Sequence, residues 1–427
     1  MWRGVKSTEA TPPLYYLLTW GFGKLFGVDS DAGLRATSAI AGAGCAPLAF
    51  AALRRMTGVR AALASSAVVA ASPMLVWYAL DARAYSLLVL LSLASLWALS
   101  LLLERATNGR YAAWAVACAA AVWTHYFAAF LVTAELVVLL WRLPARRRST
   151  LAAAAGAALL SAPLVWVISA QSDARTDHIG ALPLGERLGQ AGRQLAMGPN
   201  VPRAWLEVAG LALATGGVVA GLWIARREPG LRTVAAVLGI AIAVPLLLSV
   251  ADVADRLLAR NLLIAVPCFA ALAGAGLIRL RAVPLALLLA ASVATVVWIE
   301  ADWRYQNADW RGAARALPAR ASGELVAVLP NLDRQVAQLY LDRRYSTNRL
   351  TGSTWAMVAP ARVRRRDLRP VAIGPHVPPG FARGETRTHR GFRLVELRAL
   401  PGAAAPPPAA LGRDLLGNVP LLLVPPR

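Results

Sequence analysis

Apolar segments, each about as long as a membrane span, alternate with short polar segments through the first 300 residues. About 20 consecutive apolar residues cross the ~30 Å hydrocarbon layer of a bilayer as an α-helix. The stretch from Tyr111 to Trp141 is too long for one span, and it divides best at the "THY" sequence, Thr124 to Tyr126, into two shorter helices. The other expected spans are residues 33–53, 61–79, 83–103, 151–170, 204–225, 233–250, 260–278 and 283–300. The pattern therefore predicts a bundle of about ten transmembrane helices.

The pattern changes after residue 300, where the chain becomes polar and rich in arginine. Four strand-like runs follow, at residues 325–329, 370–374, 392–397 and 420–424, with a helix-like run at 334–345 and a linker-like "PGAAAPPPAA" at 401–410. We expect three parts: an exoplasmic, juxtamembrane segment of the first outer loop (1–32), the transmembrane bundle (33–300) and a small exoplasmic α/β domain (301–427). The predicted fold class is a multi-pass α-helical membrane protein with this C-terminal domain.

Composition agrees with the hydrophobic pattern. The chain is 57% hydrophobic and only 16% charged, with a mean hydropathy of +0.51, whereas soluble domains carry roughly 25% charged residues. These values exclude an ordinary soluble domain and predict a polytopic membrane protein, which we expect in the plasma membrane.

Arginines predict the orientation of the spans, because cytoplasmic loops retain basic residues. One set of alternate loops is expected to face the cytoplasm. Its fourteen arginines are Arg54, Arg55, Arg60, Arg105, Arg110, Arg142, Arg146, Arg147, Arg148, Arg226, Arg227, Arg232, Arg279 and Arg281. The other set comprises residues 80–83, the "THY" break and the loops 171–203 and 251–260, and it should face outward together with both termini. An outer N-terminus without a preceding span is explained most simply by one further helix upstream of Met1, and the alternative is a genuine N-out chain.

The C-terminal region is strongly basic. Residues 301–427 contain 20 Arg against 9 Asp and Glu. Such a domain near a membrane attracts anionic lipid head groups or phosphate-bearing glycans. The alternative is a general preference for arginine, since the whole chain has 43 Arg and 2 Lys. Nucleic acid is not expected as a partner outside the cell.

Several common kinds of site are not supported by the sequence. Cys45, Cys118 and Cys268 all fall within expected spans, so they form no disulfide framework or cysteine metal site. No glycine-rich phosphate loop follows a strand, and no internal repeat indicates a duplicated transporter.

Polar and aromatic residues gather instead at the expected outer ends of the spans. Asp81 and Arg83 lie in "LDARAY", His125 and Tyr126 lie in "WTHYF", and Arg260 opens a later span. Asp81 and Arg83 would not face each other on a helix, so each should meet a different partner; alternatively, Asp81 caps the following helix. Carboxylate, histidine and arginine on one side of an apolar bundle suit a reaction on a lipid-linked phosphate.

The sequence resembles the lipid-dependent GT-C glycosyltransferases, the group that includes protein O-mannosyltransferases, lipid A aminoarabinose transferases and bacterial family 39 proteins. The resemblance runs through "TPPLYYLLTWGFGKLFG", "GLRATSAIAG", "DARAYSLLVLLSL", "WTHYFAAFLV", "ARNLLIAVPCFAALAGAGL" and "DWRGAARAL", in this order. It implies transfer of a mannose-like sugar from a polyprenyl-phosphate donor to an exoplasmic hydroxyl of a glycan, lipid or protein. The catalytic acidic pair that the family carries after its first span would lie upstream of this chain.

The resemblance also implies roles for individual residues. Glu9, before "TPPLYY", and Asp81 are the catalytic candidates, and the donor phosphate is expected to contact Arg83, His125 and Arg260. Tyr85 and Tyr126 are expected to contact donor or acceptor, and Glu9 with His178 could hold a divalent metal ion, as in some relatives.

Structural alternatives stand beside these roles. His125 could be an ordinary histidine at a helix end, Arg260 a snorkelling residue, Tyr85 and Tyr126 parts of the aromatic belt, and His178 a plain loop residue. Trp303 and Trp310 are expected to anchor the outer domain at the membrane interface.

Two other functions remain open: a flippase or transporter for lipid-linked glycans, and a non-catalytic scaffold. A transporter needs ionisable residues at bilayer depth. The middles of the spans are dominated by Ala, Leu, Val and Gly, which favours the enzyme.

Overall fold

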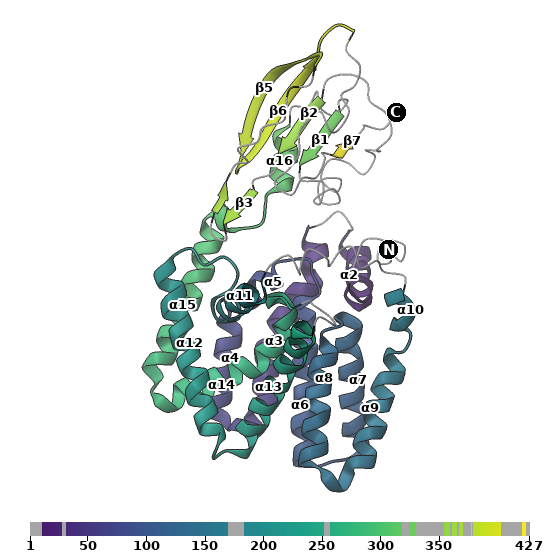
Figure 1. Ribbon diagram of the computed structural model, residues 1–427, viewed down its shortest axis with the longest axis vertical. Coiled ribbons are helices and arrows are strands. Elements are labelled where there is room, and N and C mark those ends of the chain that lie inside the picture. Colours follow the sequence, from purple (N-terminus) through teal and green to yellow (C-terminus); the bar gives the residue numbers. More distant parts are fainter. Residues whose placement is uncertain are drawn as a thin grey trace. The chain divides into compact units, whose positions relative to one another are not determined.

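The computed structural model describes residues 11–27, 31–169, 183–251, 257–317, 325–329, 354–358, 361–364, 367–369, 377, 379–402 and 421–423. The chain divides into two compact units, Met1–Val296 and Val297–Arg427. The first unit is helical and the second contains the strands (Figure 1).

The helical unit is a bundle of antiparallel apolar helices. Its elements are α2 (Leu14–Phe26), α3 (Asp31–Thr57), α4 (Val59–Ala71), α5 (Pro73–Ala79), α6 (Tyr85–Glu104), α7 (Asn108–Thr124), α8 (Ala128–Arg142), η1 (Pro144–Arg146), α9 (Arg147–Ser161), α10 (Leu164–Ser169), α11 (Leu184–Met197), α12 (Ala204–Ala225), α13 (Pro229–Val250), η4 (Ala259–Ala265), α14 (Val266–Leu280) and α15 (Ala282–Ala301). Helix α2 was not expected, because its residues fall in the segment before the first predicted span.

The described part of each predicted span is mostly helical, but the number that reaches full bilayer length is smaller than ten. Within the described residues, six helices are long and apolar enough to cross a membrane, or eight if each of two bent pairs counts as one span. Helices α7 and α8, with 17 and 15 residues, are shorter than the other spans. The protein is therefore a multi-pass membrane protein with six to eight candidate spans.

Short sequence signals explain where the helices break. The "THY" sequence separates α7 from α8, as predicted. Ser72 caps α5 by accepting a hydrogen bond from the backbone N–H of Leu75, with Pro73 in the first helical position, and α4 and α5 meet at 53°. Pro163 lies between α9 and α10, where a proline interrupts the helical hydrogen bonds.

The buried centre of the bundle is α14, which packs through glycines. A Cβ on Gly276 would collide with the backbone of Gly217 on α12, and one on Gly274 would collide with Ser65 on α4. These contacts bring helix backbones together without side chains between them, as in other membrane bundles. We infer that α14 holds η4, which precedes it, in a fixed place.

A buried carboxyl group joins α6, α7 and α8. Glu135 of α8 is fully buried. Its Oε2 accepts a hydrogen bond from Trp114 Nε1 at 2.7 Å, and its Oε1 lies 2.9 Å from Ser95 Oγ. The sequence interpretation missed this residue when it found almost no ionisable group in the middle of the spans. Because its oxygens are engaged by neighbouring helices, Glu135 serves the packing of the bundle.

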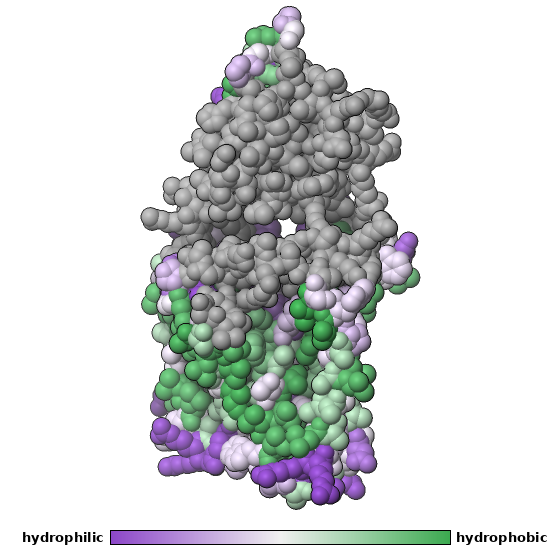
Figure 2. All heavy atoms as spheres, turned by 45° about the vertical axis from the view of Figure 1, so that its right-hand side comes forward, coloured by the Kyte–Doolittle hydropathy of each residue, from purple (hydrophilic) through white to green (hydrophobic). Residues whose placement is uncertain are grey.

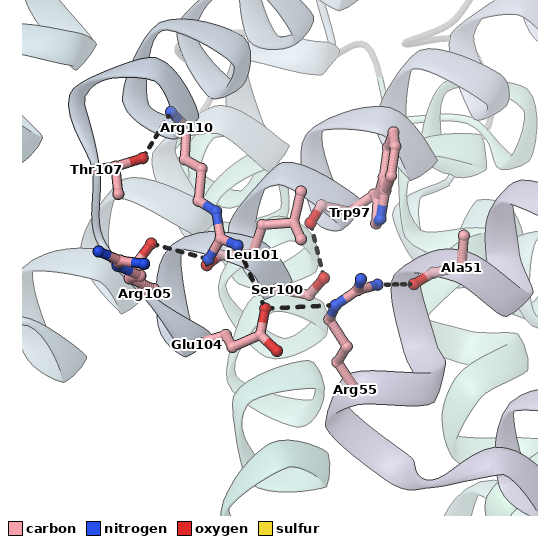
Figure 3. Close-up of polar contacts among 9 residues, drawn as sticks. All are labelled: Ala51, Arg55, Trp97, Ser100, Leu101, Glu104, Arg105, Thr107 and Arg110. Atoms are coloured by element: carbon pink, nitrogen blue, oxygen red, sulfur yellow. Dashed lines mark hydrogen bonds and ion pairs between the residues drawn. The ribbon is translucent and has the colours of Figure 1, made fainter.

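One end of the bundle is strongly basic. Figure 2 shows hydrophilic residues gathered at the lower end of the bundle, below a broad apolar belt. Some arginines there are compensated: Glu104 lies between Arg55 and Arg110, at 3.6 Å and 3.5 Å (Figure 3), and Arg279 pairs with Glu228. Three of the fourteen arginines of the alternate loops are thus paired with glutamates.

The C-terminal unit is built on a mixed sheet. It contains η5 (Trp303–Tyr305), α16 (Trp310–Ala316), β1 (Leu325–Leu329), β2 (Thr354–Val358), β3 (Ala361–Arg364), β4 (Asp367–Arg369), β5 (Phe381–His389), β6 (Phe392–Ala399) and β7 (Leu421–Leu423). The five-stranded sheet has the order β5-β6-β2-β1-β7; β1 and β2 are parallel and the other pairs antiparallel. Strands β3 and β4 form a separate pair.

The predicted strands 325–329, 392–397 and 420–424 correspond to β1, β6 and β7, which confirms an α/β domain. The predicted strand 370–374, the helix-like run 334–345 and most of the linker 401–410 lie outside the described residues.

Helix α16 packs on the β5–β6 hairpin. Asp309 caps α16 by accepting from Gly312 N at 2.8 Å, and its Oδ2 lies 3.0 Å from His389 Nε2. Burial raises the pKa of Asp309, but the bonds from His389 and Gly312 and the charges of His389 and Arg390 outweigh burial and hold this pKa below its usual value. Trp310 is 5% exposed and meets the Phe392 ring edge-on at 4.9 Å. The expectation that Trp310 anchors the domain at the membrane interface is therefore wrong, because its ring fills the core of this unit.

Candidate functional site

The turn between α5 and α6 carries the first two predicted site residues. Arg83 Nε lies 3.4 Å from Asp81 Oδ2, and Arg83 N donates to the Asp81 carbonyl at 2.8 Å. The expectation that the two side chains meet different partners is wrong, because residues 80–84 form a turn and helical spacing does not apply there. The capping alternative is also wrong: α6 begins after Ala84 and has no side-chain cap.

Two residues that the sequence interpretation missed hold this turn against α2 and α3. The Tyr15 hydroxyl and Ser38 Oγ are 2.8 Å apart, and Ser38 Oγ donates to the Arg83 carbonyl at 3.0 Å. Both side chains are buried, at 1% and 0% exposure. This chain of hydrogen bonds fixes the backbone of Arg83, while its side chain is 59% exposed.

Aromatic rings line the inner side of the turn. Tyr78 and Tyr85 have ring centroids 4.5 Å apart, and Tyr85 lies 5.6 Å from the ring of His125. The Tyr85 hydroxyl is also a hydrogen-bonding partner of Arg83. Tyr85 is 7% exposed, so it does not belong to a lipid-facing aromatic belt. Tyr126, the residue after His125, is half-buried.

His125 lies in the turn between α7 and α8, outside both helices. Its Nδ1 accepts a hydrogen bond from Phe127 N at 3.2 Å, so the proton of the neutral ring is on Nε2. Burial, and secondly the charge of Arg260, lowers the pKa of His125 to about 4. At neutral pH the ring is therefore an uncharged donor, whereas the sequence interpretation treated it as a basic residue.

Arg260 supplies the charge at this place. It lies in η4, is half-buried, and is close enough to Tyr78, Tyr85 and His125 to interact with each electrostatically. No carboxylate or carbonyl partner of its guanidinium is found among the described residues. A half-buried guanidinium without a protein anion is a strong binding group for an anionic ligand.

Helix α11, in the predicted outer loop, supports the same segment. It packs on α5 and η4. Arg187 of α11 is 3% exposed, and its Nη1 donates to the carbonyl of Leu257, shortly before Arg260. The sequence interpretation considered this loop only for Asp173, Asp177 and His178 and missed Arg187.

These contacts define one group, which we call the arginine–tyrosine cluster: Arg83, Arg260, Tyr78, Tyr85 and His125. Its members come from α5, the turn before α6, the start of α6, the turn after α7, and η4. Three of the predicted site residues, Arg83, His125 and Arg260, thus lie near one another with Tyr85, although they are far apart in the sequence. The cluster offers two guanidinium groups and neutral N–H and O–H donors, a set suited to phosphate oxygens.

The structure does not describe two of the other predicted site residues. Glu9 and His178 lie outside the described residues, so their roles as base and metal ligands stay predictions. Within the described part of the chain, no group of three or more His, Cys, Asp or Glu side chains is placed to hold a metal ion.

His125 gives a pH-dependence that can be measured. Because its pKa is about 4 in the folded protein and about 6.5 when unfolded, the unfolded chain binds more protons between these values. We therefore expect this contribution to stability to be complete above pH 6.5 and to fall by roughly 1 kcal/mol per pH unit as the pH drops toward 4. Thermal unfolding in detergent should show a steeper loss between pH 7 and 5 for the wild type than for His125→Asn. Equal pH profiles for the two proteins would contradict the assignment.

Comparisons with known proteins indicate the family and the fold. Residues 10–168 match the family described as dolichyl-phosphate-mannose-protein mannosyltransferase. This range contains α2 to α9 and four members of the arginine–tyrosine cluster. A comparison with curated proteins finds no match.

The fold is similar to that of solved glycosyltransferases. ArnT from Cupriavidus metallidurans bound to undecaprenyl phosphate is 15% identical, with a TM-score of 0.53 over 93% of this chain and 89% of that chain. ArnT from the same organism in the apo state is 16% identical, with a TM-score of 0.53 over 91% and 87% of the two chains. The oligosaccharyltransferase of Archaeoglobus fulgidus, solved with zinc and sulfate, is more distant, at 14% identity and a TM-score of 0.42 over 77% of this chain and 49% of that chain.

Proposed function

Because residues 10–168 belong to the dolichyl-phosphate-mannose-protein mannosyltransferase family of GT-C glycosyltransferases, we propose that this chain transfers a mannose-like sugar from a polyprenyl-phosphate donor to a hydroxyl group. The acceptor is a glycan, a lipid or a protein. The reaction takes place at the exoplasmic face of the plasma membrane, on the side to which the arginine–tyrosine cluster faces. The relative bound to undecaprenyl phosphate supports a lipid-phosphate ligand of this class.

The observation that carries the proposal is the guanidinium of Arg260 beside Tyr85 and His125, which has no anionic partner among the residues that the structure describes. In the proposed reaction, a carboxylate removes the proton of the acceptor hydroxyl, and the oxygen attacks the anomeric carbon with inversion. The bond from this carbon to the phosphate oxygen breaks, and polyprenyl phosphate leaves with the bonding electrons. Arg260 and Arg83 stabilise the negative charge of the leaving phosphate, and the Nε2–H of His125 donates a hydrogen bond to it.

The two carboxylate candidates have different roles in this proposal. Asp81 is paired with Arg83, which makes it a positioning residue that orients the guanidinium. Glu9, before "TPPLYY", is the proposed general base on the strength of the sequence resemblance. Together with His178, it is also the proposed ligand pair for a divalent metal ion.

The test is transfer of radiolabelled sugar in membranes that contain the chain, with polyprenyl phosphates that carry different sugars. We expect label to move into a glycan, lipid or protein fraction with at least one donor, and expect Asp81→Asn to lower the rate by about tenfold because Arg83 loses its partner. Absence of transfer with every donor would contradict the proposal and favour a flippase or a scaffold.

A further inference from the structure

The turn between α8 and α9 is a basic and aromatic surface that the proposed reaction does not use. Helix α8 ends in Trp141 and Arg142, η1 ends at Arg146, and α9 begins with Arg147 and Arg148. The axes on the two sides of the turn are bent by 110°. We call Trp141 and these four arginines the α8–α9 turn surface. No acidic residue occurs between residues 136 and 169.

These arginines differ from others at the same end of the bundle. Arg55 and Arg110 share Glu104 and donate to backbone carbonyls (Figure 3). In the turn, Arg146, Arg147 and Arg148 are exposed, and Arg142 lies over the ring of Trp141 at 5.8 Å. No ion pair or hydrogen bond of the four guanidinium groups is found in the part of the chain that the structure describes. Their charge is therefore available to an outside partner.

Local helix stability does not explain this cluster. Arg146 is the N-cap residue of α9 and Arg147 and Arg148 are its first two residues, so their positive charges interact unfavourably with the helix dipole. They also repel one another, and no side chain caps this end of the helix. Four arginines in seven residues thus carry an electrostatic cost within the protein, and an external anion would remove it.

The apolar residues beside the arginines indicate what kind of anion fits. Trp141 is 54% exposed and Leu151 is 52% exposed. Tryptophan is enriched where hydrocarbon meets the head groups of a bilayer. Trp141 and Leu151 therefore place the arginines at the edge of the hydrocarbon layer, where a phospholipid can meet the guanidinium groups with its phosphate while its acyl chains contact these apolar side chains.

We propose that the α8–α9 turn surface binds the phosphate groups of anionic phospholipids in the leaflet that it faces. Each arginine near a negatively charged leaflet adds to the attraction, and guanidinium groups bind phosphate oxygens in pairs. The site is separate from the arginine–tyrosine cluster, and it does not depend on the proposed transfer reaction.

The test is lipid binding to the full chain in neutral detergent, followed by native mass spectrometry. Phosphatidylglycerol is titrated against phosphatidylcholine with the same acyl chains. For the wild type we expect retention of phosphatidylglycerol to exceed that of phosphatidylcholine by about tenfold or more at low ionic strength, and expect this preference to weaken as salt is added. The variant R142Q/R146Q/R147Q/R148Q should bind the two lipids about equally.

Two matched variants separate local binding from other effects. R54Q/R60Q/R226Q/R281Q removes the same charge from other loops at this end, and most of the preference should remain. R147Q/R148Q changes only exposed residues and replaces the fourfold variant if that variant does not fold. It should lower the phosphatidylglycerol preference from about tenfold to about threefold, which is half of the preference on a logarithmic scale. The proposal would be overturned if R147Q/R148Q kept the phosphatidylglycerol preference of the wild type. It would also be overturned if R54Q/R60Q/R226Q/R281Q lost as much of this preference as R142Q/R146Q/R147Q/R148Q.

Discussion

Arg260→Gln is expected to lower kcat/KM for a polyprenyl-phosphate sugar by at least about a hundredfold, because it removes the positive charge at the place where the leaving phosphate gathers negative charge. Arg260 is half-buried and has no anionic partner among the described residues, which makes its guanidinium the proposed binding group for the phosphate. The substitution removes the charge but keeps a polar side chain of similar reach.

Two variants make this result specific. Arg260→Lys keeps the charge but lacks the planar pair of donors, and it should retain more activity than Gln. Arg193→Gln changes an arginine that pairs with Glu207 at 3.4 Å, outside the cluster, and it should leave kcat/KM within about threefold of the wild type, as expected for a partly exposed ion pair. Wild-type kinetics of Arg260→Gln, measured with the radiolabelled donor, would remove Arg260 from the site.

Glu135→Leu is expected to reduce the free energy of unfolding by about 2–4 kcal/mol, since it leaves the Trp114 N–H without its acceptor. The Ser95 hydroxyl loses one of its two partners and keeps the Ser92 carbonyl. Both groups are fully buried, so no water replaces the lost acceptor. The three residues come from α6, α7 and α8, and the loss should loosen the packing of these helices. The measurement is thermal unfolding in detergent.

The matched control for Glu135 is Thr133→Leu on the same helix. Thr133 is exposed and its hydroxyl returns to the Ala129 carbonyl, so this variant should keep the wild-type melting temperature. Glu135→Gln retains an oxygen that accepts from Trp114, and it should cost less than Leu. If Gln and Leu destabilise equally, the hydrogen bond from Trp114 is not the stabilising interaction.

The sequence predicts well those features that depend on local composition. Spans follow from apolar runs, the "THY" break from polar residues in a stretch too long for one helix, and β1 and β6 from short runs of β-branched and apolar residues. The basic end of the bundle was likewise predictable, because the arginines occur in alternate loops of the sequence. In each case the signal lies within a few residues of the feature.

Features that depend on three-dimensional contacts were predicted less well. The pairing of Asp81 with Arg83 depends on the conformation of a turn, and helical spacing gave the opposite expectation. Glu135 is a single acidic residue in an apolar run, and its partners lie on two other helices. A tryptophan just after the last span is typical of an interfacial anchor, and the sequence does not show that the Trp310 ring packs on Phe392. The approach of Arg260 to His125 joins segments more than a hundred residues apart, and it follows from the placement of η4 by α14.

The central claim is that the arginine–tyrosine cluster binds a lipid-linked phosphate. The most direct test is equilibrium binding of undecaprenyl phosphate and of undecaprenol, which lacks the phosphate, to the purified chain and to Arg260→Gln. We expect the wild type to bind the phosphate form at least about tenfold more tightly than the alcohol, and expect Arg260→Gln to lose most of this difference. Equal affinities of the wild type for the two lipids would contradict the claim.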